Sequence, residues 1–158
     1  MQITLTEYEI ELIHIAAKLI AERNPDLSIN IMHTSGDAEQ IIFEGKCAEY
    51  AFCKMFNLMP DLVADPRPGG SFDVFSRDKK KVDVKYTSFE HGRLIVPIWK
   101  KRESADIYVL MKGEIPDLRY CGFAACEDII DQSRVKDIGH GPTYVMNELE
   151  LSIKRKEG

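Results

Sequence analysis

The sequence has no apolar run approaching the roughly 20 residues that a membrane-spanning helix requires. It also lacks a basic start. Its first residues, MQITLTEYEIELIHIAAKL, carry glutamates where a secretory signal would have lysine or arginine. We therefore expect an intracellular, cytoplasmic protein that is neither exported nor bound to a membrane.

Cysteine and histidine are scarce, with four of each in the chain. The spacing of the cysteines, Cys-x5-Cys followed by Cys-x4-Cys, is looser than the first pair of a structural zinc site, and no histidine sits at ligand spacing. In an intracellular protein we expect reduced core thiols at Cys47, Cys53, Cys121 and Cys126. No histidine pairs with a nucleophile at a recognisable spacing, which gives a Ser-His or Cys-His hydrolase little support. Gly69-Gly70 lacks the Lys-Ser/Thr of a phosphate-binding loop.

The chain also lacks an excess of positive charge, since its formal net charge is −5. This value argues against a protein coated in basic surface for nonspecific nucleic-acid binding. The distribution is uneven: residues 71–112 hold ten Lys/Arg against six Asp/Glu, an excess of +4 that leaves −9 for the rest. Two explanations remain open, a surface that faces a polyanion and an ordinary solvated strand face.

The composition is that of a soluble globular chain, with 44% apolar and 30% charged residues. At 158 residues the chain is long enough to bury a proper core as one domain, residues 1–158. It contains no internal repeat and no low-complexity tract.

Two helices are predicted in the first third of the chain. Apolar residues at spacings of 3 and 4 predict an amphipathic helix over 5–23, with a stripe of Leu5, Tyr8, Leu12, Ile15 and Leu19. Asn24-Pro25 ends this helix. Ser35 or Asp37 can cap a second helix that runs to about Asn57.

Strand patterns follow a loop at 60–71 that is rich in proline and glycine. SFDVFS and KVDVKYTS alternate with a period of two and flank a short turn, which predicts a hairpin. Further strands are expected at 92–98, 105–111, 119–125 and, less regularly, 142–151, with a short helix over 126–132. The segment 105–111 is almost wholly apolar and therefore central. This order predicts an α/β or α+β domain in which helices cover a mixed sheet.

One carboxylate falls on the apolar stripe of the second helix. The stripe runs through Ile42, Gly45, Phe52 and Phe56, and the same spacing places Glu49 among them. Burying a lone carboxylate is costly unless a cation or a metal compensates it. The alternative is that Glu49 lies at the edge of the stripe and reaches water.

The predicted hairpin carries three more charged residues of interest. Asp83 and Lys85 are two residues apart and share one face of their strand, and Asp73 can lie close to them across the hairpin. Carboxylates that converge repel each other, and a divalent cation with hard oxygen ligands relieves that repulsion. The alternative is a solvated edge strand with a charged outer face.

Together these residues resemble the PD-(D/E)XK nuclease superfamily, which has the restriction-endonuclease-like fold. The resemblance is carried by Gly45-x-x-x-Glu49, by Gly70-Ser71-Phe72-Asp73-Val74 and by Val82-Asp83-Val84-Lys85, and it covers roughly residues 40–131. It implies that Asp73, Asp83 and the backbone carbonyl of Val84 bind Mg²⁺, for which Mn²⁺ can substitute. It also implies that Glu49 contacts the metal directly or through water, and that Lys85 positions the attacking water. The sequence departs from the family pattern at Phe72, where the family name has proline, and at Asp83, where many members have glutamate.

The resemblance implies a Mg²⁺-dependent DNA nuclease that hydrolyses phosphodiester bonds. The small size suggests phage or mobile-element DNA processing, junction resolution or restriction, by a homo-oligomer that is most simply a homodimer presenting two sites to DNA. The alternatives are a catalytically inactive module of the same fold, used for DNA binding or assembly, and a nuclease directed at RNA. Basic side chains that could contact phosphate are Arg67, Lys79, Lys80, Lys81, Arg93, Lys100, Lys101 and Arg102, although for each of them a solvated surface residue is the favoured explanation.

Overall fold

The structure, a computed structural model, describes residues 1–24, 38–62 and 72–153. The proposed helix caps Ser35 and Asp37, the Gly69-Gly70 pair and Arg67 lie outside the described residues. The two predicted helices, the hairpin and the later strands fall within them.

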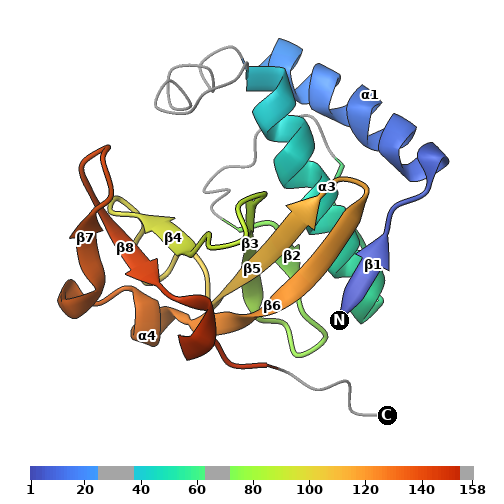
Figure 1. The fold of residues 1–158 in the computed structure, drawn as a ribbon. Helices are drawn as coiled ribbons and strands as arrows, with labels where there is room; N and C mark the ends of the chain where they lie inside the picture. The colour runs from blue at the N-terminus through green and yellow to red at the C-terminus, as the bar shows by residue number, and fades with distance from the viewer. Residues whose placement is uncertain (25–37, 63–71, 154–158) are drawn as a thin grey trace.

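A five-stranded mixed sheet forms the centre of the fold, in the order β1-β6-β5-β3-β2 (Figure 1). Its strands are β1 (Gln2–Thr4), β2 (Val74–Phe75), β3 (Lys81–Thr87), β5 (Ile107–Glu114) and β6 (Asp117–Ala125). β3 and β5 run parallel, and the other neighbours are antiparallel. The hairpin of β2 and β3 and the central place of β5 were predicted and are confirmed; β1 was not predicted.

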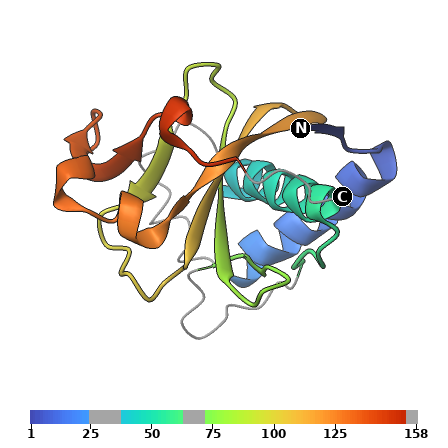
Figure 2. The ribbon, with the colours of Figure 1, turned by 90° about the horizontal axis from the view of Figure 1, so that it is seen from below.

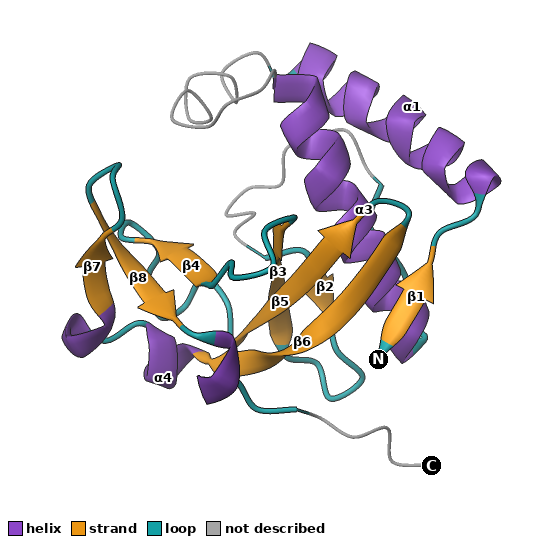
Figure 3. Cartoon of the chain, viewed as in Figure 1, coloured by secondary structure: helices purple, strands orange, loops and turns teal. Residues whose placement is uncertain are grey.

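A second, three-stranded antiparallel sheet has the order β4-β8-β7 (Figure 3). It consists of β4 (Leu94–Pro97), β7 (Val135–Asp137) and β8 (Pro142–Met146). The strands predicted at 92–98 and 142–151 therefore pair with each other and not with the large sheet. Short helical segments complete this half, namely α4 (Cys126–Ile129), η1 (Gln132–Arg134) and η2 (Glu148–Glu150).

Helices cover one face of the large sheet and the small sheet covers the other. α1 (Glu7–Arg23) and α3 (Ala38–Phe56) lie on one side, with β4, β7, β8 and α4 opposite (Figure 2). Each side has its own core: Val82, Val84 and Val109 pack towards the helices, whereas Tyr108 and Leu110 pack towards the small sheet. The predicted mixed α/β arrangement with flanking helices is thus confirmed.

The α1 helix begins two residues later than predicted and ends at the predicted Arg23, but it buries a different face. The Thr6 hydroxyl accepts from the Glu9 N–H and the Glu9 carboxylate accepts from the Thr6 N–H, which forms a capping box. The buried residues are Ile13, Ala16, Ala17 and Ile20. The predicted stripe is wrong for Tyr8, Leu12, Ile15 and Leu19, which are exposed.

The reason lies in how α1 meets α3. The buried face of α1 combines two isoleucines, Ile13 and Ile20, with two alanines, Ala16 and Ala17, and small side chains allow helix backbones to approach closely. His14 of α1 stacks on Phe43 of α3, with ring centroids 3.7 Å apart. The pattern of large apolar residues therefore does not mark the packed face of α1.

The four cysteines are buried free thiols. Burial raises the pKa of Cys47 and of Cys53 to about 12, and that of Cys121 to about 11. Within the described segments, no helix is both long enough and apolar enough to span a bilayer.

Candidate active site

The β2–β3 hairpin places Asp73 against the strand that carries Asp83. Val74 pairs with Val82, and the Asp73 N–H donates to the Val82 carbonyl at 2.8 Å, one residue ahead of the strand proper. The Asp73 carboxylate in turn accepts from the Val84 N–H, with 2.7 Å between Oδ2 and N. Both bonds hold Asp73 to β3, and its carboxylate is fixed beside the backbone between Asp83 and Lys85.

Glu49 reaches the same place from α3. Its side chain is mostly buried, and its carboxyl group interacts electrostatically with that of Asp73. Glu39, in the first turn of the same helix, is exposed. We call Glu49, Asp73 and Asp83 the carboxyl cluster; it combines a helix, the residue ahead of β2 and the middle of β3.

The carboxyl cluster has strongly perturbed acids. Burial, followed by the charge of Asp73, raises the pKa of Glu49 well above its usual value of 4.5. Burial and the charge of Asp83 likewise raise the pKa of Asp73, although the Val84 N–H opposes this. Two adjacent buried carboxyl groups disfavour each other's charged form, so each holds its proton to higher pH than an isolated carboxyl group does.

Two lysines hold Asp83. Lys85 Nζ lies 2.7 Å from Oδ1, and Lys100 Nζ lies 2.8 Å from Oδ2. The side chains of Asp83 and Lys100 are only 3% and 6% exposed, so this pair is buried. Lys85 is more accessible, with 28% of its side chain exposed.

Lys100 is a site residue that the sequence did not reveal. It was predicted as one of several surface cations that could contact phosphate, and its burial on Asp83 contradicts the view that it is a solvated residue. Its neighbours Lys101 and Arg102 are exposed. The local sequence pattern does not distinguish Lys100 from Lys101 and Arg102, because the contact of Lys100 with Asp83 depends on how the chain between β4 and β5 folds over the sheet.

Lys46 is the third lysine of the site. Its Nζ lies 2.6 Å from Glu49 Oε2 and also donates to the Asp61 carbonyl at 3.3 Å. Burial alone would lower the pKa of Lys46, but the Glu49 carboxylate outweighs this and raises it. Lys46 and Glu49 are three residues apart on one helix, so this ion pair could have been predicted from the sequence.

The site as it stands is therefore charge-compensated, with Lys46, Lys85 and Lys100 beside the carboxyl cluster. Across the described residues, no set of three or more His, Cys, Asp or Glu side chains is arranged around one metal position. The donor chemistry nevertheless suits a hard cation, since carboxylate and carbonyl oxygens are the ligands that Mg²⁺ prefers.

A buried tyrosine borders the site from β5. Tyr108 pairs with Asp83 in the parallel register of β3 and β5, and its side chain is fully buried. Its hydroxyl has no hydrogen-bond partner among the described residues. Burial and the nearby Asp83 charge raise the pKa of Tyr108.

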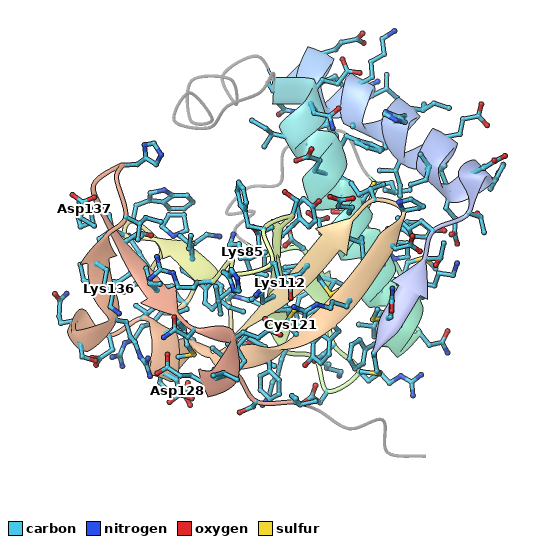
Figure 4. All side chains as sticks on the ribbon, viewed as in Figure 1. Lys85, Lys112, Cys121, Asp128, Lys136 and Asp137 are labelled. Atoms are coloured by element: carbon cyan, nitrogen blue, oxygen red, sulfur yellow. The ribbon has the colours of Figure 1, made fainter. Side chains whose placement is uncertain are left out.

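The exposed basic residues differ in how they lie relative to the site. In Figure 4, Lys85 lies near the middle of the molecule, whereas Lys136 lies on the outer strand β7. Lys80 and Arg102 are exposed and line one surface hollow beside the first residues of β3. Lys79 is exposed in the turn and adopts a φ of 61°.

Comparisons with protein-family models, with curated proteins and with solved structures give no match for this chain. The resemblance to the PD-(D/E)XK superfamily therefore rests on the motif residues of the sequence.

Proposed function

We propose that this protein is a Mg²⁺-dependent deoxyribonuclease of the PD-(D/E)XK type. The observation that carries the proposal is that Asp73 interacts electrostatically both with Glu49 of α3 and with Asp83 of β3, beside an accessible Lys85. The mixed sheet with flanking helices is compatible with the restriction-endonuclease-like fold. The motif order in the sequence is the same as in that superfamily.

Asp73, Asp83, Glu49 and the Val84 carbonyl would hold the metal. When bound, Mg²⁺ would lower the pKa of a coordinated water and neutralise charge that develops on the phosphodiester. The Val84 N–H would keep Asp73 in place during this chemistry, since it already holds one of its oxygens.

The lysines would have different tasks. Lys100 is buried and would stay on Asp83 Oδ2, which leaves Oδ1 for the metal. Lys85 is partly exposed and would turn from Oδ1 towards the substrate, where it orients the attacking water or stabilises the charged transition state. Lys46 would keep its contact with Glu49 and hold that side chain in the site.

DNA is the proposed substrate because the cations near the site suit a phosphate backbone. Lys79, Lys80, Lys101 and Arg102 are exposed and would contact phosphates without reading the sequence. Phage or mobile-element DNA processing, junction resolution and restriction are all compatible with a chain of this size.

A second candidate is a catalytically inactive module with the same arrangement. It is favoured by the two lysines that occupy both oxygens of Asp83, because a compensated cluster needs no metal. In that case the carboxyl cluster would serve to hold α3 and the hairpin together.

A substrate panel separates these candidates. Plasmid, linear and four-way-junction DNA, with matching RNA, are incubated with Mg²⁺ or Mn²⁺, and with EDTA as the metal-free control. We expect metal-dependent cleavage of DNA by the wild type and none by Asp83→Ala, while Asp128→Ala, at an exposed acid in α4, cleaves normally. Identical behaviour of wild type and Asp83→Ala on every substrate would exclude the nuclease, and a preference for RNA would change the substrate class.

A further inference from the structure

The exposed face of α1 carries a continuous row of large apolar side chains. Tyr8, Leu12, Ile15 and Leu19 are 75%, 36%, 58% and 41% exposed. We call these four residues the α1 stripe. The helix lies on the outer side of α3, away from the large sheet (Figure 1), so the α1 stripe points away from both cores.

The spacing of the α1 stripe is that of a coiled-coil seam. Its residues follow one another at 4, 3 and 4 positions, which matches alternating a and d positions of a heptad. The next seam position is Glu22, a charged residue, so the apolar row ends after two a and two d positions. A seam of this length fits one short helix–helix contact.

The charges beside the seam are self-complementary. Glu11 and Lys18 are exposed and occupy the g positions along one flank, seven residues apart. When two such helices pack antiparallel, g positions face g positions. Glu11 of one copy then faces Lys18 of the other, and the same pair recurs through the two-fold axis.

We propose that the α1 stripe is the contact through which two copies of this chain form an antiparallel, two-fold symmetric dimer. In this register Leu12 of one copy packs against Ile15 of the other, and Tyr8 packs against Leu19. The two-fold axis repeats each contact, so the interface contains two Leu12–Ile15 contacts, two Tyr8–Leu19 contacts and two Glu11–Lys18 pairs. Both copies use the same surface, so the assembly stops at the dimer.

A parallel pairing does not have the same complementarity. In a parallel pair each g position faces the e position five residues further along the other helix. Lys18 would then face Arg23, a like charge, and Glu11 would face the buried Ala16. The charges therefore select the antiparallel arrangement, independently of whether the protein is a nuclease.

Sedimentation equilibrium of the full chain tests the dimer. A single helix pair is a small interface, so we expect a weak dimer with a dissociation constant on the order of 10 µM. Ile15→Glu places a charge in the seam and should leave only monomer over the same concentrations. Leu149→Glu changes an exposed leucine outside the α1 stripe, 99% exposed in η2, and should dimerise as the wild type does. Circular dichroism of each variant confirms that it is folded.

Two charge reversals test the orientation without touching the apolar residues. Glu11→Lys and Lys18→Glu should each weaken dimerisation about fivefold or more at low ionic strength, because each creates two like-charge pairs. An equimolar mixture of the two variants should recover the dimer as a heterodimer, and so should the double variant.

Three results would overturn the proposal. One is a wild type that stays monomeric at all concentrations. Another is a dimer that survives Ile15→Glu. The third is a failure of the mixed charge variants to recover the dimer, which would exclude the antiparallel register.

Discussion

The buried carboxyl groups of Glu49 and Asp73 interact electrostatically, although one comes from the middle of α3 and the other precedes β2. Burial and the Asp73 charge raise the pKa of Glu49, so this carboxyl group holds its proton to higher pH than an isolated one does. Three lysines lie beside these acids, in a site whose oxygen atoms would suit a divalent cation. Four predictions follow from particular contacts of this site and its surroundings.

Glu49→Gln should flatten the pH dependence of stability in EDTA. The pKa of Glu49 is raised in the folded protein, so the folded state keeps a proton that the unfolded chain loses above its usual pKa of 4.5. The stabilisation from this proton is complete below 4.5 and is lost as pH rises through the folded-state pKa. Urea unfolding at a series of pH values measures this. Glu39→Gln, at an exposed site on the same helix, is the control, and equal slopes for wild type and Glu49→Gln would contradict the prediction.

Asp83 and Lys100 should show strong coupling in a double-mutant cycle. Asp83→Asn leaves Lys100 buried beside Asp83's position without its charge partner, and Lys100→Met leaves Asp83 with Lys85 alone. We expect Asp83→Asn to lower the free energy of unfolding by about 3 kcal/mol. The double variant should lose about 1–3 kcal/mol less than the sum of the two single variants, and this difference is the coupling energy. Lys101→Met, next to Lys100 but exposed, should change stability by less than about 0.5 kcal/mol. Additive effects of Asp83→Asn and Lys100→Met would show that the pair is not formed.

Glu148 should stabilise the fold only above acidic pH. Its carboxylate accepts from Arg119 at 2.6 Å and also binds the buried Lys112, and these contacts lower its pKa to about 2. A lowered pKa gives stability that is present above the usual value of 4.5 and is lost as pH falls towards about 2.

Glu148→Gln should therefore lower the free energy of unfolding at pH 7 by about 2 kcal/mol, less than for a fully buried pair because Glu148 is partly exposed. The difference from wild type should disappear as the pH approaches about 2. Glu127→Gln, at an exposed acid in α4, should show no such convergence. Denaturant curves from neutral to acidic pH decide this, and a constant difference across that range would contradict it.

Tyr108→Phe should be tolerated or should stabilise the protein. The Tyr108 hydroxyl is buried without a partner among the described residues, and such a group opposes folding. Removing it should raise the free energy of unfolding by up to about 1 kcal/mol and leave the fold unchanged. Thermal unfolding of the variant measures this; a loss of more than about 1 kcal/mol would mean that the hydroxyl makes a stabilising contact.

The local part of the site could be predicted from sequence. The alternation of KVDVKYT and SFDVFS gave the hairpin, and with it the closeness of Asp73 to Asp83. The 3-and-4 spacing of α3 placed Glu49 on an inward face. Both signals are short-range, since a strand or a helix repeats its own geometry along the chain.

The remainder depends on tertiary packing. Lys100 is buried because the chain between β4 and β5 folds back over Asp83, and no periodicity encodes that contact. The four residues of the α1 stripe have the pattern of a core face, but Ile13, Ala16, Ala17 and Ile20 are buried in their place. The pairing of β4 with β8 joins strands about 50 residues apart, too far for a sequence pattern to register.

A calorimetric Mn²⁺ titration of wild type, Asp73→Ala and Lys85→Ala tests most directly whether the carboxyl cluster is a divalent-cation site. Asp73→Ala removes an oxygen ligand and should weaken Mn²⁺ binding at least about tenfold. Lys85→Ala should bind Mn²⁺ about as tightly as wild type, since Lys100 still holds Asp83, while losing DNA cleavage. No Mn²⁺ binding by the wild type, or equal affinity in wild type and Asp73→Ala, would contradict the proposed metal site.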